Sequence, residues 1–300
     1  MIHPQVQALI DAQRTAPDAD GPPSLEAIRD RYLQIAVERG GAAEPVDDVR
    51  DVVFPRGDDE ASVAARVYTP LHGIRVPGRL VWIHGGGWCI GDLEGFDRVC
   101  RSLANAGGME VASVDYRLVP ECPFPAGLDD VRASIRWATG CDDRVVIGGD
   151  SAGANLATVA LRHERDEAVR AQVLVYPVTD GSMSGASFRE ADEQMLAVSE
   201  MEACWTAYRG SLAPDHPDVS PLHADDLAGL PPALVVVAGE DILRSDGEAY
   251  AEALRAAGVE TTLSSYDDMT HGFLRWGGVV DRSRELLAEI AAFAAEHLAA

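Results

Sequence analysis

Five short, largely apolar segments constrain the fold of this 300-residue chain more than any other feature. Segments of this kind fit strands of a parallel sheet that is buried on both faces. Stretches compatible with helices fall between or after them, so the alternation predicts an α/β protein with a mostly parallel central sheet flanked by helices. The apolar segments are 80–83, 111–114, 145–147, 173–176 and 233–237, and the helical stretches are about 97–107, 126–139, 152–165, 246–257 and 282–299.

Two regions depart from this alternation. Residues 1–45 are amphipathic and predict an N-terminal helical cap segment, in which Ser24 is placed to be the N-cap of a second helix. The polar stretch 181–223 contains a helical piece around Met195–Tyr208. We expect this stretch to be a cap insertion over the carboxyl ends of the strands, where open α/β sheets bind their ligands. The remaining chain, 46–300, is predicted to form the α/β domain.

Charge and cysteine usage narrow the classes of function. The chain has 49 acidic and 25 basic residues, a net charge of −24, and every basic residue is Arg. This charge repels phosphate backbones and disfavours nucleic-acid binding, and the absence of Lys excludes a Walker-A lysine or a lysine Schiff base. Five dispersed cysteines without a CxxC pair fit free thiols in a reducing compartment. With no signal-peptide pattern and no long apolar run, we expect a cytoplasmic protein without a membrane span.

The most informative motif follows the third apolar segment. Residues 149–153 read Gly-Asp-Ser-Ala-Gly, between a predicted strand and a predicted helix. A bare G-x-S-x-G pattern arises by chance in a glycine-rich chain, but the strand before it and the helix after it favour a nucleophile elbow. Gly149 and Gly153 must be small because the serine sits on a sharp, strained turn. We therefore predict that Ser151 is a nucleophile.

A second glycine-rich motif follows the first apolar segment. Residues 84–88 read His-Gly-Gly-Gly-Trp. Three glycines alone could form a simple flexible turn, but such a turn rarely needs His before it and Trp after it. Backbone without side chains lets N–H groups approach a developing oxyanion. We predict the amides of Gly86, Gly87 and Ala152 as the donors, with Gly85 permitting the bend.

An activated serine needs a histidine base and a carboxylate that orients it. Of the eight histidines, only His271 lies in a short loop after a late strand and before the last helix. The usual chain order, nucleophile, acid and then histidine, confines the acid to residues 152–270. The candidate acids near the end of the buried segment 233–237 are Glu240, Asp241 and the more distant Asp246.

The two glycine motifs together resemble those of the hormone-sensitive-lipase-like (bacterial family IV) carboxylesterases of the α/β-hydrolase fold. Residues 115–121 are similar to that family's D-Y-R-L-A-P-E segment, with Val119 in place of Ala, and segments 220–222 and 230–233 also match. The resemblance covers roughly residues 45–300. It aligns Asp241 with the family's D-P-L motif, although Ile242 replaces Pro and Ser245 stands where a second Asp is frequent. The resemblance therefore implies Asp241 as the acid, with Glu240 and Asp246 as alternatives.

The resemblance implies a serine carboxylesterase that hydrolyses short- to medium-chain esters through an acyl-enzyme, with no cofactor and no metal. The implied partners are a small-molecule ester and a possible second copy of the chain, paired through the last strand at about 260–266. Aromatic and Met side chains near the motifs and in the insertion are candidates to line the substrate pocket. They are Trp88, Phe96, Met201, Trp205, Tyr208, Phe273 and Trp276.

Other functions would fit the same motifs. An amidase or deacetylase, or a hydrolase of natural-product esters, would use the same nucleophile and base. A non-catalytic small-ligand-binding protein of the same fold is a further alternative, because plant hormone receptors resemble this family. Such receptors typically lack the catalytic histidine, so the presence of His271 favours an enzyme.

Overall fold

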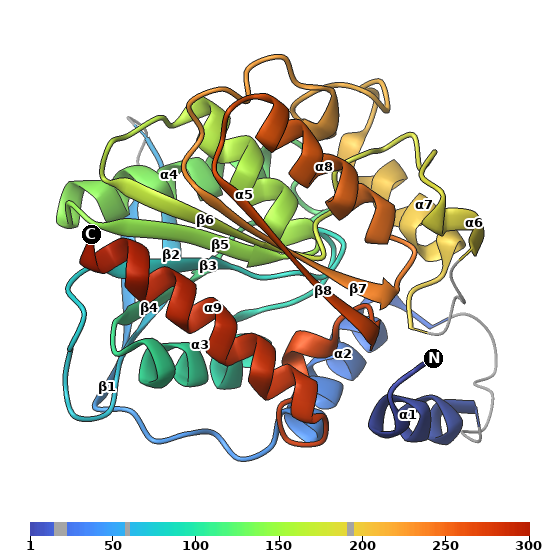
Figure 1. The fold of residues 1–300 in the computed structure, drawn as a ribbon, viewed down its shortest axis with the longest axis horizontal. Helices are drawn as coiled ribbons and strands as arrows, with labels where there is room; N and C mark the ends of the chain where they lie inside the picture. Colours follow the sequence, from blue (N-terminus) through green and yellow to red (C-terminus); the bar gives the residue numbers. More distant parts are fainter. Residues whose placement is uncertain (15–22, 58–60, 191–194) are drawn as a thin grey trace.

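The computed structural model describes residues 1–14, 23–57, 61–190 and 195–300 (Figure 1). Within them, one eight-stranded sheet has the order β1-β2-β4-β3-β5-β6-β7-β8. From β4 to β8 all neighbouring strands are parallel, and only β2 runs antiparallel to its two neighbours. The strands are β1 (Asp48–Pro55), β2 (Ser62–Thr69), β3 (Arg79–Ile83), β4 (Glu110–Asp115), β5 (Val145–Asp150), β6 (Val169–Val175), β7 (Ala233–Glu240) and β8 (Thr261–Thr270).

Helices cover both faces of the sheet, as the alternation predicts. Leu80 and Trp82 of β3 pack into one hydrophobic core and Val81 and Ile83 into another, because successive side chains of a strand point to opposite faces. Helices α3 and α9 pack in the first core, and α4, α5 and α8 in the second (Figure 1). The bounds are α3 (Leu93–Gly107), α4 (Ala126–Cys141), α5 (Ala152–His163), α8 (Arg244–Ala256) and α9 (Asp281–Ala299).

The sheet edges are less evident from the sequence than its centre. The pattern of apolar residues did not predict β1, in which Phe54 is the single fully buried residue. The other edge strand, β8, was expected only as a late strand before His271, at about 260–266 by the family resemblance, and it extends to Thr270. Each edge strand is partly exposed and therefore carries polar residues where central strands carry Val, Ile and Leu. The predicted α/β fold with a mostly parallel sheet is confirmed.

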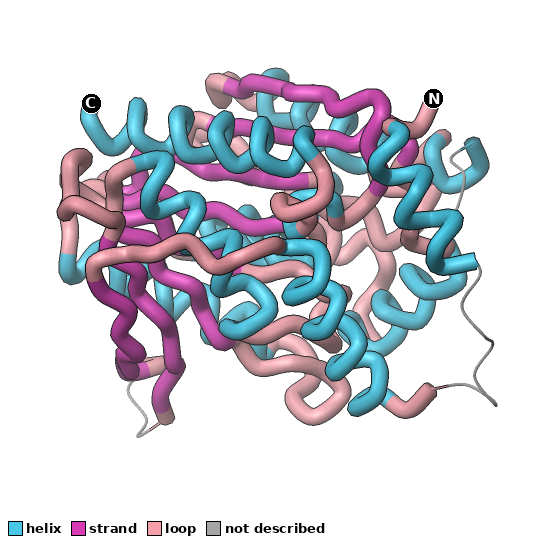
Figure 2. Tube along the Cα trace, turned by 90° about the horizontal axis from the view of Figure 1, so that it is seen from below, coloured by secondary structure: helices cyan, strands magenta, loops and turns pink. Residues whose placement is uncertain are grey.

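Four helices lie at the carboxyl end of the parallel strands, α1 (Pro4–Arg14), α2 (Leu25–Gly40), α6 (Ser187–Glu190) and α7 (Val198–Arg209) (Figures 1 and 2). Ser24 is the N-cap of α2, as predicted, and its side chain accepts a hydrogen bond from the Ala27 amide. The predicted break between the two N-terminal helices falls mainly on 15–22, outside the described residues. Short 3₁₀ turns at Pro221–His223 and Phe273–Arg275 complete the elements.

Helix α5 anchors both ends of the insertion. The Asn155 side-chain amide donates to the carbonyl oxygens of Val178, just before the insertion 181–223, and of Val219, near its end. Asn155 is one turn after Ser151, so the same helix that begins at the candidate nucleophile also fixes where the insertion leaves and rejoins the domain.

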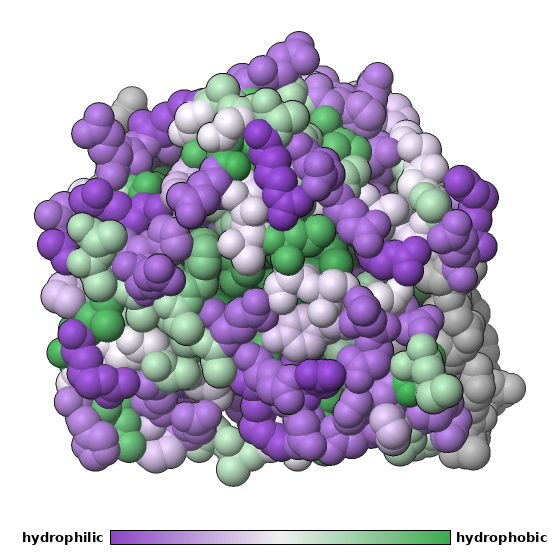
Figure 3. Space-filling model, viewed as in Figure 1, coloured by the Kyte–Doolittle hydropathy of each residue, from purple (hydrophilic) through white to green (hydrophobic). Residues whose placement is uncertain are grey.

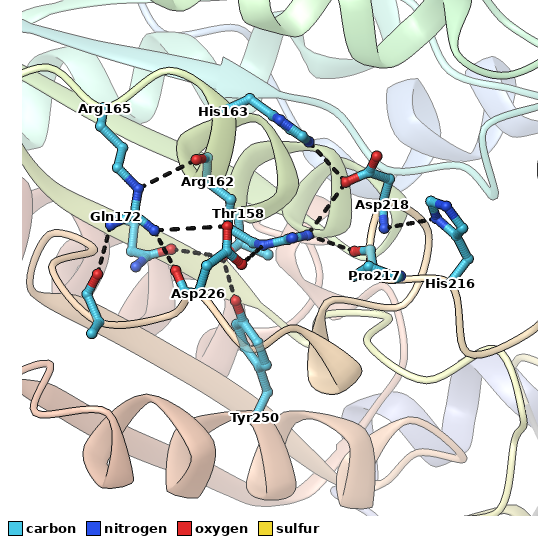
Figure 4. Close-up of polar contacts among 11 residues, drawn as sticks. Thr158, Arg162, His163, Arg165, Gln172, His216, Pro217, Asp218, Asp226 and Tyr250 are labelled. Carbon is cyan, nitrogen blue, oxygen red and sulfur yellow. Dashed lines mark hydrogen bonds and ion pairs between the residues drawn. The ribbon is translucent and has the colours of Figure 1, made fainter.

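The far end of α5 holds the returning segment of the insertion through a polar cluster (Figure 4). Arg162 is a buried residue, 9% exposed, and its guanidinium donates to Asp226 at 2.6 Å and to the Pro217 carbonyl at 2.7 Å. His163 contacts the carboxylate of Asp218 at 2.8 Å. A buried guanidinium with several acceptors gives a directional contact that an apolar surface cannot supply.

Hydrophilic residues cover much of the face in Figure 3, interrupted by hydrophobic ones. No helix in the described part of the chain is long and apolar enough to cross a membrane.

Candidate active site

Ser151 stands on a strained turn between β5 and α5. Its φ of 53° and ψ of −120° are unusual for a residue with a side chain. A Cβ on Gly149 would lie 2.6 Å from the Ile83 carbonyl oxygen, and one on Gly153 would lie 2.0 Å from it. Both flanking positions therefore need glycine, which is the constraint predicted from the motif.

The structure brings Ser151, His271 and Asp241 into one chain of contacts. His271 Nε2 lies 3.0 Å from Ser151 Oγ, and Nδ1 lies 2.7 Å from Asp241 Oδ2. The Asp241 side chain is 0% exposed, and its other oxygen accepts the Leu243 amide at 3.0 Å. The imidazole thus lies between a hydroxyl and a buried carboxylate, which is the geometry that a general base requires.

The two alternative acids point elsewhere. Glu240 is partly exposed, and its carboxylate accepts a hydrogen bond from the N-terminal ammonium of Met1 at 3.2 Å. Asp246 is buried, and its Oδ2 accepts the amides of Thr179 and Asp180. Among the three candidates, Asp241 is the one in hydrogen-bond contact with the imidazole.

Two features hold the imidazole in place. His271 follows directly after β8, and Gly272 adopts a φ of 80°, which lets the chain turn away after the histidine. The ring of Tyr176 packs against the imidazole with centroids 4.6 Å apart. Sequence reasoning did not identify Tyr176 as a neighbour of the site. Its place in the sequence could have indicated this contact, because Tyr176 ends the fourth apolar segment at the same edge of the sheet as Ser151.

The glycine loop after β3 fits closely among its neighbours. Gly86 and Gly87 have φ values of 126° and 56°. A Cβ on Gly86 would lie 2.1 Å from the Ile90 carbonyl oxygen, and one on Gly87 would lie 2.5 Å from Cys204 Sγ. Ala152 begins α5, whose first amides have no partner within the helix. These backbone groups are the predicted oxyanion donors, and side chains at 86 and 87 would displace the loop.

His84 and Asp150 fix the start of this loop. The Gly85 amide donates to Asp150 Oδ1 at 3.0 Å, and His84 Nδ1 lies 2.9 Å from the Gly85 carbonyl oxygen. Tyr116, from the segment 115–121, donates its hydroxyl to the His84 carbonyl at 2.9 Å. Burial lowers the pKa of His84 to about 4, so its imidazole is neutral at pH 7 and Nδ1–H acts as the donor.

Asp150 was not among the residues predicted to have a role. It is the second residue of the Gly-Asp-Ser-Ala-Gly motif, where the elbow pattern accepts any residue. Burial raises the pKa of its carboxyl to about 6, while the positive charge of Arg275 and the Gly85 amide oppose that rise. The carboxylate links the strand that carries the nucleophile to the loop that carries the oxyanion donors.

The candidate pocket residues are all buried, and they divide between the two cores. On one face the ring of Trp88 stacks on that of Tyr208 at 4.2 Å and 1°, and Trp205 contacts Trp88 at 4.8 Å. Met201 belongs to this core, whereas Phe96, Phe273 and Trp276 belong to the other. A cavity of about 440 Å³ lies between α2 and segment 115–121, and none of the seven lines it. Their role in substrate binding stays a prediction.

A family model described as alpha/beta hydrolase fold matches residues 80–275. The chain belongs to this family. This α/β hydrolase is 36% identical to the carboxylesterase NlhH of Mycobacterium tuberculosis, over 95% of the chain and 92% of that protein. It is 32% identical to an ethyl acetate hydrolase of Pseudomonas putida, over 97% and 96% of the two chains.

Solved structures agree with these sequence relatives. The hyperthermophilic esterase of the archaeon Pyrobaculum calidifontis superposes on this α/β hydrolase with a TM-score of 0.89 and 31% identity, covering 100% of the chain and 99% of the esterase. A thermostable esterase of Pseudomonas putida superposes with a TM-score of 0.92 and 28% identity, covering 99% and 98%. The predicted α/β-hydrolase fold and the resemblance to hormone-sensitive-lipase-like carboxylesterases are confirmed.

Proposed function

We propose that this α/β hydrolase is a serine carboxylesterase, with Ser151 as nucleophile, His271 as base and Asp241 as orienting acid. The observation that carries the proposal is the continuous contact from Ser151 Oγ through the imidazole to the buried carboxylate of Asp241. Its relatives include proteins named carboxylesterase and ethyl acetate hydrolase, so the reaction class and the geometry agree.

The geometry supports a two-step acyl transfer. Ser151 Oγ attacks the ester carbonyl while His271 Nε2 takes its proton, and Asp241 stabilises the imidazolium through Nδ1–H. The amides of Gly86, Gly87 and Ala152 would hold the negative oxygen of the tetrahedral intermediate. His271 then gives the proton to the leaving alcohol. Water, activated in the same way, releases the acid from Ser151.

We infer that the substrates are short- to medium-chain esters, from acetate to about octanoate. One relative is named an ethyl acetate hydrolase, which favours a small acyl group. The stacked rings of Trp88, Trp205 and Tyr208 adjoin the glycine loop and are each at most 2% exposed. A wall of packed aromatic rings favours a bounded pocket over an open lipid-binding surface.

A series of p-nitrophenyl esters from acetate to laurate tests the proposal. Hydrolysis should be greatest at short or medium chain length and should be lost in Ser151→Ala and His271→Ala. A p-nitroanilide of the same acyl group tests the amidase alternative. An organophosphate should label Ser151 in the unaltered protein, whereas a non-catalytic binding protein would stay unlabelled. Hydrolysis that persists in either variant contradicts the assignment.

Three further assignments accompany this function. We propose that α1 and α2 of segment 1–45, together with α6 and α7 of the insertion 181–223, act as the cap over the site.

We propose a homodimer paired through β8, which is an edge strand and so has an unpaired side. Light scattering of the purified protein would show a monomer if that pairing is wrong. A cytoplasmic location stays our expectation, and the five cysteines are free thiols in the structure.

A further inference from the structure

Two cysteines from distant parts of the chain meet beside the glycine loop. Cys89 follows Trp88 in the loop after β3, and Cys204 lies on α7 of the insertion. The Cys204 thiol lies close enough to Cys89 that each thiol shifts the pKa of the other. A Cβ on Gly87 would lie 2.5 Å from Cys204 Sγ, so Cys204 also packs directly on the predicted oxyanion loop.

The contact between α7 and this loop does not depend on the thiols alone. Trp205 and Tyr208, the neighbours of Cys204 on α7, both pack on the ring of Trp88, with centroids 4.8 and 4.2 Å away. These aromatic contacts hold α7, and with it Cys204, against the loop that carries Cys89. Cys89 and Cys204 are each only partly buried residues.

The charges around the pair make the two thiols unequal. The Arg29 guanidinium donates to the Cys89 carbonyl oxygen at 2.9 Å. The neighbouring Cys204 thiol and the positive charge of Arg29 lower the pKa of Cys89, although burial and Glu121 oppose this. The pairing with Cys89, together with burial, raises the pKa of Cys204. A thiol that ionises readily, next to a second thiol, is the arrangement of a peroxide-sensitive cysteine and its resolving partner.

We propose that Cys89 and Cys204 are an oxidation site at which hydrogen peroxide forms a disulfide between the glycine loop and cap helix α7. The Cys89 thiolate attacks a peroxide oxygen, the O–O bond breaks, and the leaving hydroxide becomes water by taking up the thiol proton. The product is a sulfenic acid on Cys89. Cys204 then attacks this sulfur, the S–S bond forms, the S–O bond breaks, and a second water leaves. Two thiols lose two electrons in total, and one hydrogen peroxide is reduced to two waters.

The disulfide is expected to lower esterase turnover. Bonded sulfur atoms lie about 2.05 Å apart, closer than any two sulfur atoms that are not bonded. Forming the bond therefore draws α7 and the loop together at Gly87, whose amide is a predicted oxyanion donor. This second effect rests on the proposed function, whereas formation of the bond does not.

The test begins with the fully reduced protein, treated with a small excess of hydrogen peroxide and then with iodoacetamide. Mass spectrometry of the non-reduced digest should find the peptides of Cys89 and Cys204 joined, with the loss of two hydrogens. Cys89→Ser and Cys204→Ser should each abolish this product. Cys141→Ser is the matched control, because Cys141 is exposed and should be dispensable for the crosslink.

Activity is measured on the same samples. Hydrolysis of p-nitrophenyl butyrate should fall at least several-fold after oxidation and return with dithiothreitol, in the unaltered protein and in Cys141→Ser. A crosslink elsewhere, or overoxidation of Cys89 without a crosslink, would overturn the proposed site. A crosslink that leaves turnover unchanged would overturn its coupling to the loop. Mass spectrometry detects the crosslink whether or not the protein hydrolyses esters. If the proposed function is wrong, the untreated protein will show no esterase activity, and the crosslink is still tested.

Discussion

Replacing Asp241 with Asn tests which carboxylate orients the base. Asp241 has two occupied oxygens, since Oδ2 faces His271 Nδ1 at 2.7 Å and Oδ1 accepts the Leu243 amide at 3.0 Å. An Asn keeps only one acceptor oxygen. If that oxygen accepts from Leu243, the new NH₂ group faces Nδ1 and forces the imidazole to carry its proton on Nε2. In that tautomer His271 cannot take the proton of Ser151.

The other amide orientation does not avoid the loss. With the oxygen toward His271, the NH₂ group faces the Leu243 amide, so two donors meet in a buried place at a cost of about 1–3 kcal/mol. The orientation that leaves the base usable is therefore populated at only about 1–20%, and it lacks the negative charge that stabilises the imidazolium. The wrong tautomer in a serine-histidine-aspartate site costs about 10⁴ in kcat, which is about 5.5 kcal/mol of barrier. We expect kcat to fall by about 10³–10⁴ in Asp241→Asn.

The assay is hydrolysis of p-nitrophenyl butyrate at pH 8, with thermal unfolding as a check that the variant is folded. Glu240→Gln is the matched control, because the adjacent carboxylate contacts the N-terminal ammonium and not the imidazole. It should keep kcat within about twofold of the unaltered enzyme, since an exposed pair of this kind contributes little. A folded Asp241→Asn enzyme with nearly full turnover, or a large loss in Glu240→Gln, would refute the reasoning.

Three other predictions concern the loop and a buried carboxyl. Gly86→Ala should lower kcat by about 10²–10³, because the new Cβ would meet the Ile90 carbonyl at 2.1 Å and displace an oxyanion donor. A change in KM with kcat unaltered would contradict this. Asp150→Ala should lower kcat by tenfold or more, because the Gly85 amide loses its acceptor, and Asp150→Asn should recover much of that loss since its oxygen still accepts. Burial raises the pKa of Asp246 from 3.8 to about 7. Between these two pH values the folded chain retains a proton that the unfolded chain releases. The free energy of unfolding therefore falls as the pH rises from about 4 to about 7. In urea titrations, the free energy of unfolding of Asp246→Asn should therefore fall less between pH 4 and pH 7 than that of the unaltered protein, and equal slopes would refute the assignment.

The sequence by itself predicted the centre of this molecule well. Central strands such as β3 and β5 are buried on both faces, so their apolar composition identifies them without any tertiary information. The elbow is equally local. Gly149 and Gly153 are needed because the backbone of a tight turn approaches its own neighbours. A five-residue motif is therefore enough to predict the elbow.

Tertiary packing decided what local pattern left open. Glu240 is the last residue of β7 and Asp241 follows it, and the family resemblance favoured Asp241 without settling the choice. Their side chains diverge at the end of β7, so one carboxylate meets an imidazole and the other meets the N-terminus. The contact of Cys204 with Cys89, and that of Asp150 with Gly85, join residues far apart in the chain. Such contacts depend on how whole helices and loops pack, whereas sequence periodicity reports only which side of each element is buried.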